Sequence, residues 1–324
     1  TSTKTQTDPR APTGHLDALY YSHKQRTPPM TTTKNLHLDH PEDAILTGDL
    51  SVLDWFAANS HISVKMDGAP AICYGTNPEN GQWFVGTKSI FNKQKVKINY
   101  CTDDIIVNHP QVEVQIILQT CLDLLPRTEG IYQGDFIGFG GGSVYTPNTI
   151  TYDFGEEVQA SIIMAPHTEY LPSYPGAPIN EHVSTPILET FESNEDVMFV
   201  QPTVDCTELF ADSVESIRKS VEKSKFLDDK QAKEVRIILN AFIREGKSIS
   251  PQLLEQVVGD WTLTQSYFQV LDLKEQMMEA MKVYDGPEAY IADRQIDCEG
   301  FVRTNKYGSM KLVDRYQFAQ ANFN

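Results

Sequence analysis

The sequence is short of cysteine and of long apolar segments. Its 324 residues include five cysteines, and no two of them form a C-x-x-C pair. An odd and scattered set argues against a disulfide framework or a zinc site, and it favours the reduced thiols of a cytoplasmic protein. No apolar run approaches the roughly 20 residues that cross a bilayer, and the polar N-terminal residues are unlike a signal peptide. We therefore expect a cytoplasmic protein that does not contact membranes.

Positive charge is also scarce. The chain has 27 lysines and arginines against 44 aspartates and glutamates, a net charge of −17. Such a surface repels phosphate backbones, so a protein that coats nucleic acid broadly is excluded. Any nucleic-acid partner, whether RNA or DNA, has to meet a local basic patch. The densest patch is Lys93, Lys95 and Lys97, with Phe91 and Tyr100 beside it. It either faces phosphates or forms a solvated edge.

What the chain does contain is an ordinary globular composition, 40% hydrophobic and 22% charged. This length allows one large domain or two ordinary ones. Residues 1–36 are polar and rich in threonine and proline, so we expect an arm or linker with at most a short helix at 16–21. Residues 205–285 have a helical pattern and are predicted to be an insertion. The segments 37–204 and 286–324 then form one domain around it.

Apolar periodicity predicts a mixture of helices and strands. The helices expected in the first half cover 41–46, 50–58 and, as one or two helices, 102–125. The strands expected cover 62–65, 71–74, 83–88, 129–138, 149–154, 159–164 and 197–201, and 171–195 is expected to be a loop. Within the insertion, helices are expected at 213–223, 229–245, 251–258 and 263–284. Residues 298–315 are predicted to be a β-hairpin with its turn at 305–308.

The most informative stretch is residues 61–71. Ile62 and Val64 alternate with polar residues, which predicts a half-buried strand that ends at Gly68. Lys65 then lies at the end of the strand, and Asp67, two residues on, shares its face. A lysine becomes a nucleophile when burial or nearby cations lower its pKa. The alternative is an ordinary surface pair of lysine and aspartate in a turn.

Three further pieces follow in a fixed order. They are Tyr132-x-Gly-Asp135, Glu299-Gly-Phe-Val302 and Met310-Lys-Leu-Val313. Together with Lys65-x-Asp-Gly68 they resemble motifs of the covalent nucleotidyltransferase superfamily, which comprises ATP-dependent DNA ligases, RNA ligases and mRNA capping enzymes. The resemblance covers about 61–154 and 286–315. It implies an α+β fold: an ATP-grasp-like nucleotidyltransferase (adenylation) domain of antiparallel sheets flanked by helices, here with a helical insert and no C-terminal OB-fold.

The resemblance also implies roles for the motif residues. Lys65 attacks the α-phosphate of ATP to form a lysyl-AMP intermediate, and Lys311 meets the same phosphate and lowers the pKa of Lys65. Glu299 holds Mg²⁺ or Mn²⁺. Asp135 accepts a hydrogen bond from the ribose. Further ATP contacts are expected at Val64, Asp67, Gly68, Lys88 and Val302, with Tyr152 or Phe154 stacking on the base; for these two aromatics the alternative is packing in the core.

Two positions depart from the pattern of DNA ligases: Pro70 stands where they usually have arginine, and Ser309 where a lysine is common. The lack of an OB-fold makes RNA ligases the closer comparison, and a compact chain of this kind is typical of tailed phages. We therefore predict an ATP-dependent adenylyltransferase that joins RNA or DNA ends. One alternative is self-adenylation with a protein or small-molecule acceptor. The other is a binding or structural protein without catalysis.

Overall fold

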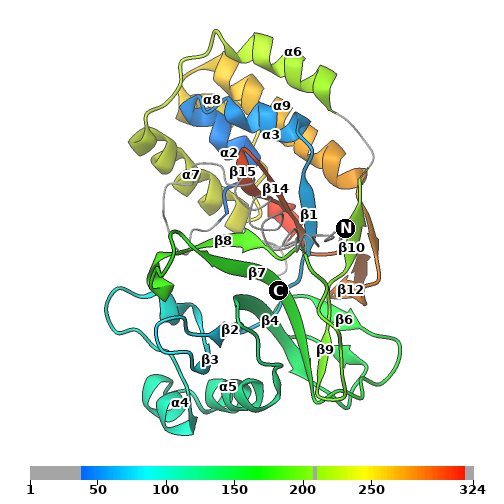
Figure 1. The fold of residues 1–324 in the computed structure, drawn as a ribbon. Helices are drawn as coiled ribbons and strands as arrows, with labels where there is room; N and C mark the ends of the chain where they lie inside the picture. The colour runs from blue at the N-terminus through cyan, green and yellow to red at the C-terminus, as the bar shows by residue number, and fades with distance from the viewer. Residues whose placement is uncertain (1–37, 207–209, 318–324) are drawn as a thin grey trace, which may run out of the picture.

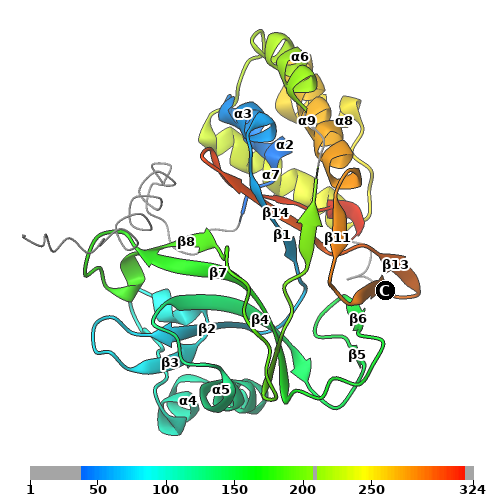
Figure 2. The ribbon, with the colours of Figure 1, turned by 45° about the vertical axis from the view of Figure 1, so that its right-hand side comes forward.

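The computed structural model describes residues 38–206 and 210–317 (Figure 1). The chain folds into an α+β structure whose strand pairs are antiparallel, with one parallel exception, so the predicted class is confirmed. Figures 1 and 2 show α2, α3 and α6–α9 gathered at one end of the molecule and α4 and α5 at the other, with sheets between them. In the described part of the chain, no helix is both long enough and apolar enough to cross a membrane. The short helix predicted at 16–21 lies outside the described residues.

The largest sheet has six strands. Their order is β3-β2-β4-β7-β8, and β9 pairs in parallel with β7. The strands are β2 (Ala71–Thr76), β3 (Trp83–Gly86), β4 (Ile131–Phe139), β7 (Ile162–Pro172), β8 (His182–Pro186) and β9 (Val197–Phe199). Helices α4 (Thr102–Asn108) and α5 (Val112–Leu124) pack on one face, where Ile105 and Leu118 meet Ile72 and Phe136 in a buried cluster.

A three-stranded sheet contains the first and the last motif of the sequence. It has the order β1-β14-β15, formed by β1 (His61–Lys65), β14 (Gly300–Asn305) and β15 (Gly308–Leu312). Val64, Phe301 and Leu312 point from one face into the apolar core. Because side chains alternate along a strand, Lys65, Val302 and Lys311 share the opposite face. The register places Lys65 opposite Gly300, and Val302 opposite Lys311.

Helices cover the apolar face of this sheet. They are α2 (Pro41–Ala44), the 3₁₀ helix η1 (Ile45–Thr47), α3 (Ser51–Ala57), α6 (Ala211–Val221), α7 (Asp229–Arg244), α8 (Pro251–Val258) and α9 (Trp261–Glu279). One hydrophobic cluster includes Trp55 of α3, Val270 of α9 and Phe301 of β14. The helices of residues 205–285, predicted as an insertion, therefore share a core with the first helices and with the three-stranded sheet.

Two small sheets complete the fold. A four-stranded sheet has the order β13-β12-β6-β5, and β10 pairs with β11 alone. The strands are β5 (Val144–Tyr145), β6 (Thr151–Asp153), β10 (Thr203–Asp205), β11 (Lys282–Tyr284), β12 (Glu288–Ile291) and β13 (Arg294–Ile296). Short 3₁₀ helices occupy Lys88–Phe91 (η2) and Ile179–Glu181 (η3).

Several predicted boundaries were wrong. The helix expected at 263–284 ends at Glu279, and Lys282–Tyr284 pairs with β10 instead, because a partner strand outweighs local propensity. The loop expected at 171–195 contains β8. Residues 102–125 form two helices, and the break falls at His109 and Pro110, since proline lacks the N–H that a continuous helix requires.

A group of buried charges joins the helices to the end of β15. Lys274 of α9 donates to Glu42 of α2 at 2.8 Å and to the carbonyl of Val313 at 3.1 Å. Arg315 donates to Asp43 at 2.9 Å and to Glu42 at 3.3 Å. Glu42 is 0% and Lys274 1% exposed. We call Glu42, Asp43, Lys274 and Arg315 the buried quartet; its two acids and two bases balance within the core.

Removing one member of the quartet leaves a charge buried without its partner. We expect Lys274→Ala to lower the free energy of unfolding by about 3–5 kcal/mol, as for other broken buried ion pairs. Urea denaturation at pH 7 measures this. The control is Lys247→Ala, which breaks an exposed pair with Glu245 and is expected to cost under about 1 kcal/mol. Equal losses in the two variants would show that burial of the quartet is energetically unimportant.

Candidate active site

Lys65 and Glu299 form the centre of the site. Lys65 is the last residue of β1, and Glu299 directly precedes β14, so the pairing of the two strands brings them together. The ammonium of Lys65 donates a hydrogen bond to Oε1 of Glu299. The side chain of Lys65 is 37% exposed and that of Glu299 12% exposed. The lysine thus reaches the surface, while its carboxylate partner lies mostly beneath it.

Glu299 is an unusual acid. Burial raises its pKa from 4.5 to about 7, Lys65 lowers it, and the nearby carboxylates Asp67 and Asp135 raise it. Its second oxygen, Oε2, is buried and has no hydrogen-bond partner among the described residues. Three carboxylates therefore lie close enough to influence one another around a single lysine.

Both carboxylate oxygens of Asp67 accept hydrogen bonds from residues that precede β6. Its carboxylate accepts hydrogen bonds from the backbone N–H groups of Thr149 and Ile150, at 2.8 and 2.9 Å, and from the amide of Asn148 at 2.9 Å. Its backbone N–H donates to the hydroxyl of Tyr152 at 2.6 Å. Asp67 therefore connects the segment after Lys65 to the loop before β6, a contact that no pattern in the sequence predicts.

The two aromatic residues predicted to stack on a base are placed differently from that expectation. The side chain of Tyr152 is buried, and the residue is 2% exposed. Phe154 packs edge-on against Tyr145 at 5.6 Å. A ring with both faces covered offers no surface to a base, so Tyr152 acts through its hydroxyl, which holds Asp67. The core-packing alternative describes both rings.

Gly68 allows the chain to approach β4 closely. A Cβ at this position would lie 2.6 Å from Cβ of Asp135 and 2.8 Å from the carbonyl of Phe136. The backbone continues this contact, because the N–H of Ala69 donates to the carbonyl of Phe136 at 3.0 Å. Only glycine fits here without displacement. Asp135, the acid of the second piece, is thereby held beside the Lys65 segment.

Lys311 adds a second cation to the same face. It lies opposite Val302 on β15, and its backbone N–H donates to the carbonyl of Asp39 at 3.1 Å. Burial lowers the pKa of Lys311, and the positive charges of Arg315 and Lys65 lower it further. The two lysines are therefore near enough to repel each other, as the resemblance implies. Val64, which precedes Lys65, is buried in the core.

The remaining predicted cations lie near β3, at the edge of the large sheet. Lys88 is exposed and begins η2, directly after β3. Burial raises the pKa of Cys73 on β2, Lys88 lowers it and Asp135 raises it, so Lys88 and Asp135 both lie within electrostatic range of Cys73. Lys93 and Lys95 are exposed in the loop after η2, which runs along the outer edge of β3. Lys97 donates to the carbonyl of Asn108 at 2.8 Å, so one of the three patch lysines supports the fold.

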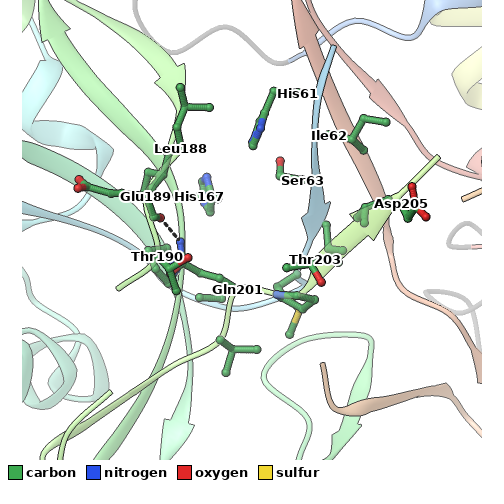
Figure 3. Close-up of a pocket in the computed structure, with 18 of the residues that line it drawn as sticks. His61, Ile62, Ser63, His167, Leu188, Glu189, Thr190, Gln201, Thr203 and Asp205 are labelled. Carbon is green, nitrogen blue, oxygen red and sulfur yellow. Dashed lines mark hydrogen bonds between the residues drawn. The ribbon is translucent and has the colours of Figure 1, made fainter. Parts of the chain in front are cut away.

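A pocket of about 450 Å³ lies beside β1. Ser63 and His61, on the same strand face as Lys65, form one wall, and His167 of β7 lies across from them (Figure 3). The segment 200–206 closes another side, where the amide of Gln201 donates to the carbonyl of Glu189 at 3.1 Å. The described residues lining the pocket include neither lysine nor arginine. The pocket therefore suits a neutral group better than a phosphate.

His167 links this pocket to the motif residues. Its Nε2 lies 3.6 Å from Oδ2 of Asp135, and its Nδ1 lies 2.7 Å from the hydroxyl of Thr168. Sequence reasoning missed it because the strand was predicted to end at 164, whereas β7 continues to Pro172. No regular alternation marks residues 162–172, and Pro166 interrupts the run, so the sequence offered little signal for the longer strand. His167 lies on β7, the strand that pairs directly with β4, which contains Asp135.

The donor set limits the kind of metal that fits. Among the described residues, no group of three His, Cys, Asp or Glu side chains is arranged to hold an ion. Mg²⁺ is commonly held by one or two carboxylates together with substrate phosphates and water. Glu299, with one buried oxygen that lacks a partner, fits such an ion. The residues thus suit a metal that arrives with a phosphorylated substrate.

Comparisons with known proteins place the chain in a family. A model for a family of unknown function, DUF6267, matches residues 35–262 and 251–324. These ranges take in most of the chain, so the protein belongs to this family. Neither the curated proteins nor the solved structures contain a match.

The burial of Glu299 predicts a pH-dependent stability difference. The folded protein holds a proton on Glu299 up to a pH of about 7, whereas the ordinary carboxyl releases it at 4.5. The unfolded chain therefore binds fewer protons between these values, and stability falls as pH rises. Glu299→Gln removes this pH dependence. We therefore expect the difference in free energy of unfolding between the variant and wild type to shift by about 3 kcal/mol in favour of the variant as the pH rises from 4.5 to 7.

Urea unfolding of both proteins at four pH values across that window measures the difference. The control is Glu195→Gln, because Glu195 is exposed and its replacement leaves the pH dependence unchanged. Parallel stability curves for wild type and Glu299→Gln would contradict the assignment of a raised pKa to Glu299.

Proposed function

We propose that the protein is a nucleotidyltransferase that uses Lys65 as its nucleophile and ATP as its substrate. One observation carries the proposal: Asp135, Glu299 and Lys311, all far from Lys65 in the sequence, come together with Lys65 and its near neighbour Asp67. A lysine–carboxylate contact alone is common, but here a second lysine lies on the same strand face, and two neighbouring cations favour the binding of an anion. The α-phosphate of a nucleotide is such an anion.

The pocket beside β1 supports the placement of the nucleoside. It is lined by Val64 and Met66, the two residues that flank Lys65, and its volume lies within the range of small-molecule sites. Its lack of cations suits a base and a ribose; neither Lys65 nor Lys311 lines it, so the phosphates would extend out of the pocket past Val64 and Met66 toward the two lysines. His167 offers a planar ring for stacking, in place of the predicted Tyr152 or Phe154. Oδ2 of Asp135 lies 3.6 Å from Nε2 of His167, so Asp135 could accept a hydrogen bond from the ribose of a nucleoside whose base stacks on His167.

The chemistry follows from these positions. Lys65 loses one proton to Oε1 of Glu299, with which it is already in contact. The freed electron pair of its nitrogen forms a bond to the α-phosphorus, and the bond to the bridging oxygen breaks, so that pyrophosphate leaves with that electron pair. Lys311 stabilises the negative charge that develops on the α-phosphate. A divalent ion, when bound, would neutralise phosphate charge, with Oε2 of Glu299 as its protein ligand.

The same proposal includes the type of fold. Two mainly antiparallel sheets, one with Lys65 at the end of β1 and the other containing Asp135, support an ATP-grasp-like nucleotidyltransferase domain. The acceptor we propose is an RNA or DNA end, guided by Lys93 and Lys95, which remain exposed. The net charge of −17 favours the second candidate, a self-adenylating enzyme with a protein or small-molecule acceptor.

Self-labelling tests the proposal directly. Incubation with ATP labelled at the α-phosphate and Mg²⁺ or Mn²⁺, followed by a denaturing gel, is expected to give labelled protein. Lys65→Arg abolishes the label, because a guanidinium does not lose its proton. Lys311→Ala slows labelling by about 10²-fold or more, since it removes one charge-stabilising group. Lys306→Ala, an exposed lysine in the turn between β14 and β15, is the matched control and labels at the wild-type rate.

The acceptor is tested with the labelled protein. Transfer of AMP to a 5′-phosphorylated RNA or DNA end supports ligation, and loss of label to other acceptors supports the second candidate. Absence of label with either metal and with either ATP or GTP would leave only the non-catalytic alternative.

His167 is expected to contribute to nucleotide affinity by stacking. We expect His167→Ala to raise the ATP concentration for half-maximal labelling about five- to tenfold, since stacking on a base contributes about 1–3 kcal/mol. His167→Phe keeps a planar ring and is expected to retain most of the affinity. Titration of ATP against the rate of labelling measures both. Equal defects in the two variants would indicate that the imidazole acts through hydrogen bonds and not through its ring face.

A further inference from the structure

A second cavity, of about 250 Å³, lies in the helical part of the molecule, away from the Lys65 pocket. It is bounded by α7, α9 and the residues that follow β15. Its apolar walls come from Ile243, Ile249, Phe268, Leu271 and Met278. A cavity of this size holds a small molecule, and its apolar walls favour a compact hydrocarbon body.

Polar groups at the cavity are unevenly satisfied. Glu42, which is 0% exposed, lines it. Its Oε1 accepts from Lys274 and Arg315, whereas its Oε2 is buried and has no hydrogen-bond partner among the described residues. A buried acceptor without a donor is unfavourable, so a ligand that brings a donor to Oε2 gains a strong contact.

The charged residues around the cavity decide whether a cationic or an anionic ligand is favoured. The buried quartet is neutral, with Glu42 and Asp43 against Lys274 and Arg315. Three further carboxylates line the cavity: Glu275, Glu279 and Asp314. None of them has a salt bridge within the described chain. Burial raises the pKa of Glu275, Lys274 lowers it, and the acidic neighbours Asp314, Asp272 and Glu42 raise it.

We infer that this cavity binds a small primary amine that carries an apolar group, with the ammonium at Oε2 of Glu42 and the apolar body against α9. A bare metal ion fits less well, because no group of three ligand side chains is present in the described residues and because most of the wall is apolar. An anion would meet three uncompensated carboxylates. The site is separate from Lys65, so it does not depend on the proposed nucleotidyl transfer.

Ligand binding here has a direct connection to the end of β15. Arg315, a quartet member, follows Lys311 by four residues, and Lys274 donates to the carbonyl of Val313. Asp39, whose carbonyl accepts from Lys311, precedes Glu42 by three residues. An amine bound to Glu42 would therefore contact a residue that is linked to Lys311 both through the segment 39–42 and through the segment 311–315.

The test uses the full-length protein and benzylammonium chloride as the probe, with benzyl alcohol and sodium benzoate as its neutral and anionic counterparts. Isothermal titration calorimetry and thermal unfolding are read together. We expect saturable heat and a rise in Tm with benzylammonium, weaker effects with the alcohol and none with benzoate. Glu275→Gln combined with Glu279→Gln is expected to weaken binding by about fivefold, the scale of partly exposed charge contacts.

Two tryptophan variants locate the binding. Leu271→Trp fills the cavity and is expected to abolish binding, whereas Gln265→Trp, on an exposed turn of the same helix, retains it. Circular dichroism confirms that both variants are folded. The inference is overturned if wild type gives no heat with benzylammonium, n-butylammonium or tryptamine, if benzoate binds as well as the amine, or if folded Leu271→Trp binds unchanged.

Discussion

The pairing of β1 with β14 is the contact on which the candidate site depends. It joins Lys65 to Glu299 across a sequence separation of 234 residues. In an antiparallel pair, a slip of one residue turns every side chain to the other face. Such a slip would bury Lys65 in the core and expose Val64 to the cleft. The apolar residues of the opposite face, Phe301 and Leu312 among them, prevent it because they pack against the helices. The helical part of the molecule thus fixes the register of the active face.

Two kinds of electrostatic arrangement coexist in the fold. The buried quartet is balanced, with each charge in contact with an opposite one, and so it stabilises the junction of α2, α9 and the end of β15. The cleft is unbalanced. Glu299 is near two other carboxylates, and Lys311 is near another lysine. Fixed structure requires the first arrangement, whereas binding of a charged ligand benefits from the second.

The proximity of Lys65, Asp135, Glu299 and Lys311 was predicted from the sequence because each residue belongs to a short motif near the end of a predicted strand, and the order of these motifs resembles that of a known superfamily. The sequence did not predict the contacts of Asp67 with the side-chain amide of Asn148 and with the backbone N–H groups of Thr149 and Ile150, which any sequence supplies. It missed His167 for a similar reason, since a histidine acquires meaning only when β7 pairs with β4. Helices were predicted better than short strands: the insertion helix at 251–258 matches α8. β11 depends on β10, a partner far away in the sequence, whereas β8 is a short strand that pairs with the preceding β7.

Glu299 gives the strongest physical argument that the cleft binds something. Its carboxylate is desolvated, one oxygen lacks a partner, and its pKa is raised to about 7. A glutamine of the same shape would avoid the cost of burying the charge. The fold nevertheless surrounds this residue with two more acids and places the nucleophilic candidate Lys65 against it. Stability alone favours none of these choices. In the proposed function, a phosphate and its counter-ion on the face that Lys65 and Lys311 share would make these choices favourable together.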